Sequence, residues 1–116
     1  LWVNEHRKNR LLAYDVQPDG WLDRRRVFHT LSSKGLLPPE SSHELGPDGM
    51  CQDDRERLWV AHYGAGCVVA LDTEGTRLGT IMLPRGTKPT NIAYDAAHSA
   101  LYITESERGL LYRITV

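Results

Sequence analysis

The stretch Leu58-Trp59-Val60 decides the fold, because the chain repeats it as Leu1-Trp2-Val3 and as Leu101-Tyr102-Ile103. The three copies start 57 and 43 residues apart, and each joins a leucine, an aromatic residue and a β-branched residue. The similarity continues downstream, where Leu12-Ala13-Tyr14-Asp15 matches Val69-Ala70-Leu71-Asp72. Self-similarity at such a period is typical of repeat architectures, so we expect an array of similar units.

The middle copy lies in a series of short β-strands. Apolar and β-branched residues alternate with turn formers such as Gly64-Ala65-Gly66 and Asp72-Thr73-Glu74-Gly75, and Pro84 ends the series. This pattern predicts strands at residues 49–52, 58–63, 67–71 and 77–83. Four antiparallel strands within about 40 residues are typical of a β-propeller blade. The sequence therefore predicts a complete blade over residues 46–84.

Two incomplete blades flank the complete one. Strands are predicted at 1–5, 11–15 and 25–28 within residues 1–31, and at 91–94, 100–105 and 110–116 within residues 88–116. The expected fold is all-β, with ten strands that make about two and a half blades. Open blade edges leave backbone groups unpaired, which favours self-association. Residues 32–46 are rich in Ser, Pro and Gly and predict a long loop, a kind of segment that is often functional.

Composition excludes several classes of partner. The 116 residues carry 14 basic and 15 acidic side chains, for a net charge of −1. This balance argues against nucleic acid and against an anionic membrane surface. The sequence has no apolar run near the roughly 18 residues of a membrane span. Residues 1–10 lack a secretory signal pattern, so we expect a cytoplasmic protein.

The two cysteines are predicted to be reduced. Cys51 falls on the strand before residues 58–63, and Cys67 falls on the strand after them. If consecutive strands pair, two strand spacings separate the cysteines by roughly 9–10 Å. A disulfide needs Cα atoms within about 7 Å of each other. Two free thiols also suit a cytoplasmic location.

An acidic residue stands directly before the first strand of the complete blade, in Gly46-Pro47-Asp48-Gly49. A carboxylate at a turn in that place would lie at the mouth of the central channel of a propeller. Carboxylate, amide and backbone oxygens are the ligands that hard cations such as Ca²⁺ prefer. One acid does not make a metal site, so several blades would each have to contribute a ligand.

Three stretches carry a resemblance to a known family: Pro47-Asp48-Gly49-Met50-Cys51, Leu58-Trp59-Val60-Ala61-His62-Tyr63 and Lys88-Pro89-Thr90-Asn91-Ile92-Ala93. In this order they resemble the C-terminal portion of the SMP-30/gluconolactonase/luciferin-regenerating-enzyme-like family of six-bladed lactonases. Residues 1–15 and Arg24-Arg25-Arg26-Val27-Phe28 look like the family's fourth blade. The resemblance covers essentially the whole chain.

The resemblance implies hydrolysis of a sugar-type lactone with a divalent cation, with Ca²⁺ preferred over Zn²⁺ or Mg²⁺. The family holds its cation with a Glu, two Asn and an Asp, and the Asp falls on Asp48, which is expected both to bind the metal and to help activate water. The Glu and both Asn are expected upstream of Leu1. Two alternatives stay open: a non-catalytic propeller module that binds a partner, and a truncated fragment without activity.

The other polar residues are expected to have structural roles. Asn4-Glu5-His6 and His62-Tyr63 are expected at solvent-facing strand ends, and His43-Glu44 is expected on a solvated loop. Thr90 occupies the position of Asp48 in the next repeat, where a strand-entry hydrogen bond explains it as well as a place facing the channel. Arg24-Arg25-Arg26 is expected to protect an outer edge with charge.

The recurring aromatic residues are assigned to packing between blades. Trp2, Trp59 and Tyr102 occupy one position of the repeat, so inter-blade packing explains them better than a ligand-stacking platform does.

Overall fold

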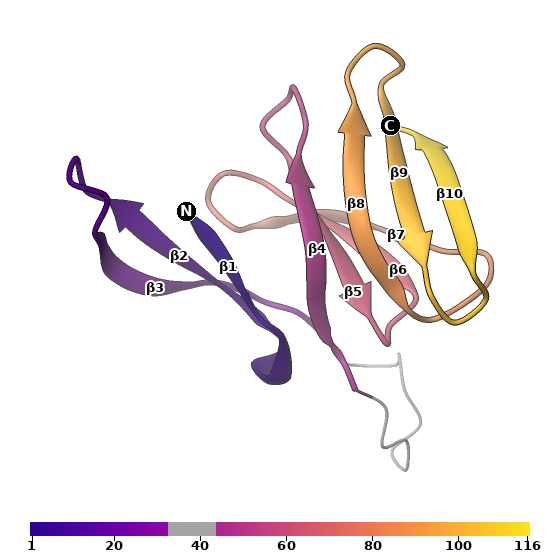
Figure 1. Cartoon of the computed structure of the whole chain (residues 1–116), viewed down its shortest axis with the longest axis horizontal. Helices are drawn as coiled ribbons and strands as arrows, with labels where there is room; N and C mark the ends of the chain where they lie inside the picture. Colours follow the sequence, from indigo (N-terminus) through magenta and orange to yellow (C-terminus); the bar gives the residue numbers. More distant parts are fainter. Residues whose placement is uncertain (33–43) are drawn as a thin grey trace.

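The computed structural model describes residues 1–32 and 44–116, and these residues form ten strands in three antiparallel sheets (Figure 1). The first sheet has the order β1-β2-β3, the second β4-β5-β6-β7, and the third β10-β9-β8. Each strand pairs with its neighbour in the sequence, as in a propeller blade. The predicted all-β fold and the grouping of strands into three, four and three are confirmed.

Strand bounds follow the sequence pattern closely. The first sheet consists of β1 (Trp2–Glu5), β2 (Arg10–Val16) and β3 (Leu22–Thr30), with a 3-10 turn, η1 (His6–Lys8), after β1. The second consists of β4 (Gly46–Gln52), β5 (Leu58–Tyr63), β6 (Cys67–Leu71) and β7 (Arg77–Met82). The third consists of β8 (Pro89–Asp95), β9 (Ala100–Glu105) and β10 (Leu110–Thr115). The main differences are the early starts of β3 and β4.

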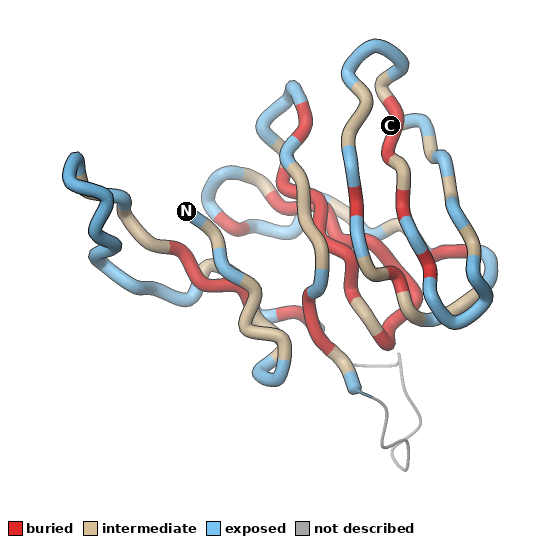
Figure 2. Tube along the Cα trace, viewed as in Figure 1, coloured by how far each residue is buried: buried red, intermediate tan, exposed pale blue. Residues whose placement is uncertain are grey.

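Two hydrophobic layers join the three sheets. Leu58 and Val60 of β5 pack in a layer with Leu11 of β2, whereas Trp59 and Ala61 pack in a second layer with β8 and β9. Because successive side chains of a strand point to opposite faces, β5 contributes to both layers. Burial is therefore concentrated in the middle sheet (Figure 2).

Two of the three repeated aromatic residues lie in these layers, as the repeat indicates. Trp2 packs against the first layer and its ring lies 5.8 Å from that of Phe28, while Trp59 is buried in the second layer. Tyr102 is only half-buried, because its face of β9 is directed away from the second layer, which contains Leu101 and Ile103.

The outer faces of the first and third sheets carry exposed apolar side chains. Val3 pairs with Leu12, which pairs with Val27, so these residues share one face of the first sheet. Val27 is 51% exposed, and Leu111 of the third sheet is 66% exposed. Faces of this kind are covered when neighbouring repeats stack on them. Self-association through open edges stays a prediction.

The arginine run lies exposed on an edge strand, as predicted. Arg24, Arg25 and Arg26 lie on β3, which is an edge strand of the first sheet. Their side chains are exposed, and Arg26 pairs with Asp15 at 3.0 Å. Charged side chains along an edge oppose pairing with another chain.

Both cysteines are free, and the strands that carry them lie on either side of β5, as predicted. Burial raises the pKa of each thiol to about 11, and the charge of Asp53 adds to this effect at Cys51. Neither thiol is therefore ionised to a useful degree at neutral pH. Within the described residues, the fold has no helix long and apolar enough to cross a membrane.

Candidate functional site

Asp48 lies within strand β4, not at a turn ahead of it. Pro47 pairs with His62 and Met50 pairs with Val60, so Asp48 and Gly49 together oppose one residue of β5. This is a β-bulge, which bends a strand and redirects a side chain. The sequence prediction placed the strand three residues too late, because Pro47-Asp48-Gly49 was interpreted as a turn. β4 is an edge strand, where proline costs no ladder hydrogen bond.

The bulge directs Asp48 into a hollow between the first two sheets. The hollow has a volume of about 410 Å³ and is lined by Asn4, His6, Glu44, Pro47, Asp48 and Tyr63. Its walls come from β1, η1 and the beginning of β4, which lie side by side (Figure 1). Asp48 itself is exposed, so its carboxylate is open to a ligand.

A side chain of β1 and one of η1 hold the main chain around Asp48. The Asn4 amide nitrogen donates to the Asp48 carbonyl, and His6 Nδ1 donates to the Pro47 carbonyl at 3.1 Å. His6 Nε2 lies 3.1 Å from Glu44, and its ring meets the Tyr63 ring edge-on. The backbone carbonyls of Pro47 and Asp48 are thus fixed by contacts from β1 and η1.

The donor set around Asp48 fits a hard cation. The Asn4 side-chain oxygen is buried and has no partner among the described residues, so it is a second free oxygen donor in the hollow. Amide and carboxylate oxygens are what Ca²⁺ and Mg²⁺ take as ligands. No group of three or more His, Cys, Asp or Glu residues able to hold a metal occurs in residues 1–32 and 44–116. This part of the molecule therefore supplies only part of a metal site.

Close contact between β4 and η1 maintains the hollow. Gly46 lies against His6, and a Cβ built on it would come within 2.2 Å of the His6 carbonyl oxygen. A clash with backbone cannot be relieved by rotating a side chain. The glycine therefore allows the two segments to approach.

We expect Gly46→Ala to destabilise the protein by about 2 kcal/mol or more, because overpacking at a fixed backbone contact displaces whole segments. Gly79→Ala is the matched control, since nothing lies within 4 Å of its added Cβ. Denaturant unfolding of both variants measures the difference. Equal stabilities of the two would contradict the close approach.

The outcomes for the other polar residues differ. His62 is buried at 1% exposure, so the prediction that it faces solvent is wrong. The imidazole is accommodated in the core because its Nε2 forms a 2.7 Å hydrogen bond with Oδ1 of Asn9, which is 53 residues away in the sequence. Glu44 is exposed, as predicted, and it also lines the hollow of Asp48, whereas His43 lies outside the described residues. Thr90 bonds Thr104 across the strands at 2.8 Å, which supports the hydrogen-bond interpretation.

The supporting roles of Asn4 and His6 were missed by sequence reasoning. Their partners lie 44 and 41 residues away, and no local motif links them. The sequence signal that could have identified them is their position just after Leu1-Trp2-Val3, the first copy of the repeat. In a propeller blade, that end of the strand faces the central channel.

Comparison with known proteins agrees with the fold. The sequence model of the SMP-30/gluconolactonase/LRE-like region matches residues 1–107. The chain belongs to this family. Regucalcin of Danio rerio, a relative, is 34% identical over 99 residues, which are 84% of this chain and 30% of that protein. Lactonase drp35 of Staphylococcus saprophyticus is 36% identical over 86 residues, which are 72% of this chain and 24% of that protein.

The chain therefore spans less than a third of the length of these SMP-30 family relatives. A solved structure of a calcium-binding protein, regucalcin, from Agrobacterium tumefaciens superposes with a TM-score of 0.71 at 20% identity. It covers 99% of this chain and 41% of that one. The resemblance seen in the sequence and the partial propeller fold are both confirmed.

Proposed function

We propose that the full-length protein is a metal-dependent lactonase that opens a sugar-type lactone to its hydroxy acid. The observation that carries the proposal is the open carboxylate of Asp48 on a bulge whose two flanking carbonyls are held by Asn4 and His6. A relative named lactonase supports the reaction class, and a relative named regucalcin, a name borne by a calcium-binding protein, supports the kind of ion.

Asp48 is assigned two roles in this proposal. Its carboxylate is one ligand of a divalent cation, with Ca²⁺ preferred over Zn²⁺ or Mg²⁺, and most of the remaining ligands come from outside this chain. The bound cation supplies a Lewis acid that polarises the lactone carbonyl. The second carboxylate oxygen orients the attacking water and accepts its proton.

Asn4 and His6 act through the main chain of β4. A carboxylate on a bulge would otherwise sample several positions, and misplacement of a reacting group by about 1 Å costs up to ~100-fold in rate. Fixing both neighbouring carbonyls limits this motion. We further propose a cytoplasmic protein with a small-molecule substrate, in line with two free cysteines.

The test is metal removal from the full-length protein. Stripping with a chelator is expected to lower turnover of an aldonolactone by about 100-fold or more, because the Lewis acid contributes several kcal/mol. Added Ca²⁺ should restore the rate, and Zn²⁺ and Mg²⁺ are compared in parallel. An aryl ester of similar size serves as the control substrate. A metal-loaded protein that binds the lactone but does not open it would favour the non-catalytic module instead.

A further inference from the structure

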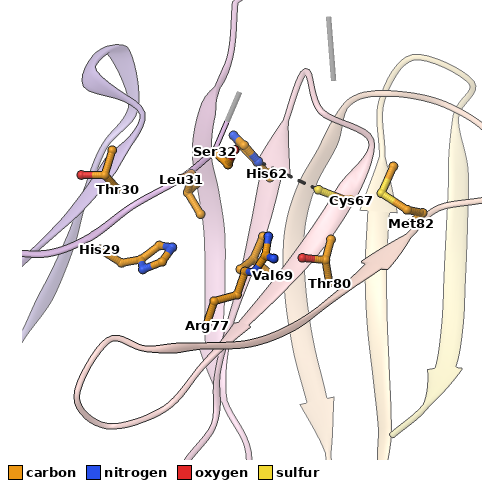
Figure 3. Close-up of a pocket in the computed structure, with 10 residues that line it drawn as sticks. All are labelled: His29, Thr30, Leu31, Ser32, His62, Cys67, Val69, Arg77, Thr80 and Met82. Atoms are coloured by element: carbon orange, nitrogen blue, oxygen red, sulfur yellow. Dashed lines mark hydrogen bonds between the residues drawn. The ribbon is translucent and has the colours of Figure 1, made fainter. Parts of the chain in front are cut away.

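A second cavity lies between the first two sheets and shares no lining residue with the hollow at Asp48. Its volume is about 550 Å³. Figure 3 shows His62, Cys67 and Met82 along one side of it, with His29 on the other side. Its residues take no part in the proposed lactonase reaction, so the cavity needs an explanation of its own.

The register of the second sheet places three potential ligands in one row. Cys67 of β6 pairs with His62 of β5 on one side and with Met82 of β7 on the other. Paired residues of antiparallel strands direct their side chains to the same face of the sheet. An imidazole, a thiol and a thioether therefore stand next to one another, and all three line the cavity (Figure 3).

Hydrogen bonds fix which nitrogen of His62 is free. Asn9 donates through its amide nitrogen to the Leu31 carbonyl at 2.9 Å, so its Oδ1 is the atom that faces His62. His62 Nε2 must then carry the proton of the 2.7 Å bond to Asn9. The lone pair is left on Nδ1, which lies 3.9 Å from Cys67 Sγ. Metal-binding histidines are commonly oriented in this way, with the other ring nitrogen bonded to an oxygen.

The order Asn9, His62, Cys67 also occurs in cysteine hydrolases, but this site lacks their activated nucleophile. Burial raises the pKa of the Cys67 thiol to about 11 and lowers the pKa of His62 to about 4, with a further lowering from His6. The resting pair is therefore a neutral thiol beside a neutral imidazole. At neutral pH a thiol of that pKa is ionised to about one part in 10⁴, so it is a poor nucleophile. A metal ion can displace the thiol proton directly.

We propose that His62 Nδ1, Cys67 Sγ and Met82 Sδ form a binding site for one soft monovalent ion, Cu(I). Thiolate and thioether sulfur select Cu(I), and imidazole also suits copper. On binding, the Cys67 proton passes to the buffer and a sulfur–copper bond replaces the S–H bond. No electron is transferred, because the ion enters as Cu(I). The site is independent of the proposed lactonase.

The 3.9 Å between Sγ and Nδ1 fits an ion with three ligands. With metal–sulfur and metal–nitrogen bonds of about 2.3 and 2.05 Å, that separation corresponds to an angle of about 125–130° at the metal. Such an angle fits three ligands in a plane. Zinc prefers four tetrahedral ligands, and a thioether is a poor partner for it. His29 does not complete such a set, since its Nδ1 bonds the Gly75 carbonyl at 2.8 Å and it lies across the cavity (Figure 3).

The test is anaerobic titration of the reduced full chain with Cu(I), in competition with a coloured Cu(I) chelator. We expect one tightly bound ion and a thiolate-to-copper charge-transfer band. Cys67→Ser should weaken binding by about 100-fold or more, and Met82→Leu by about 10-fold, because each removes one ligand at nearly constant volume. Cys51→Ser is the matched control, since Cys51 lies on β4 outside the row, and it should change affinity less than about 2-fold.

Thermal unfolding provides a second measurement of Cu(I) binding, and it does not require substitution of a buried residue. An ion that binds only the folded chain raises the midpoint of unfolding, and Met82→Leu, a change at a 57% exposed residue, should reduce that rise by the equivalent of its 10-fold weaker binding, about 1.4 kcal/mol. Weaker Cu(I) binding by Cys67→Ser and Met82→Leu, together with unchanged binding by Cys51→Ser, supports the site. Absence of a tightly bound ion in the unaltered chain, equal affinity in Cys67→Ser, or an unaltered thermal shift in Met82→Leu overturns it.

Discussion

Asp48→Ala in the full-length protein is expected to lower kcat/KM for lactone hydrolysis by about 1000-fold or more, since general-base catalysis alone contributes about 10²–10⁴-fold. The variant also removes a proposed metal ligand, so its affinity for Ca²⁺ should fall as well. The measurement is a pH-stat assay of aldonolactone opening, with calcium binding followed by calorimetry. Both quantities change together only if one carboxylate serves both roles.

The fold should survive this change. Asp48 is exposed and its carboxylate makes no hydrogen bond within the described residues, so the free energy of unfolding should change by no more than about 0.5 kcal/mol. The main-chain bonds from Asn4 and His6 go to carbonyl groups, which alanine retains. An unchanged far-UV circular dichroism spectrum beside lost activity separates a site defect from a folding defect.

Asp72→Ala provides the opposite control. Asp72 Oδ1 accepts hydrogen bonds from the backbone of Glu74 and Thr76 at 2.9 and 2.8 Å, so it stabilises the turn after β6. Removing it should cost about 1–2 kcal/mol of stability and leave turnover within 2-fold of the unaltered protein. Full activity in Asp48→Ala would refute the catalytic role, whatever the fate of Asp72→Ala.

The strands could be predicted because each is a local pattern that the repeat confirms two more times. β5 is an example, because a strand buried on both faces has a nearly continuous apolar sequence. Its aromatic residue Trp59 also recurs in β1 and β9, as Trp2 and Tyr102. The same local reasoning failed at the start of β4. Proline there indicates a turn by its chemistry, and only the edge position in the sheet makes it compatible with a strand.

The site was only half accessible to sequence reasoning for a similar reason. Asp48 was found because it stands in a short motif, whereas the contacts that position it come from Asn4 on β1 and His6 on η1, more than 40 residues away in the sequence. The burial of His62 depends on a hydrogen bond with Asn9, which lies in the turn between η1 and β2. Contacts of this kind depend on how blades pack, which no period within one blade encodes.

Asp53→Ala is expected to cause the largest loss of stability of any single change in the second sheet. Its side chain has no exposure to solvent and accepts four hydrogen bonds. Oδ1 takes the backbone N–H groups of Arg55 and Arg57, each at 2.9 Å, and Oδ2 takes Arg57 Nε at 2.6 Å and Trp59 Nε1 at 2.8 Å. Alanine would leave these donors unpaired, including the buried indole N–H. We expect a loss of about 3–5 kcal/mol, measured by denaturant unfolding.

Acid should reproduce part of this loss. Burial by itself would raise the pKa of Asp53, but the hydrogen bonds from Trp59, Arg57 and Arg55 outweigh it and lower the pKa below its ordinary value. A carboxyl whose pKa is depressed by folding stabilises the protein above its unfolded pKa of about 4, and that contribution is lost as the pH falls through the folded value. The unaltered protein should therefore lose stability below about pH 4 more steeply than Asp53→Ala does.

Comparison with a second turn separates burial from turn chemistry. Asp95 closes the corresponding turn between β8 and β9, where Oδ1 accepts from Ala97 and Oδ2 meets His98, but its side chain is 28% exposed and no buried indole depends on it. Asp95→Ala should thus cost clearly less than Asp53→Ala. Trp59→Phe in the Asp53→Ala background should cost less than Trp59→Phe alone, because the indole N–H has already lost its acceptor. Additive losses would mean that Asp53 acts on the turn alone, not as the link between the turn and the layer that joins the second and third sheets.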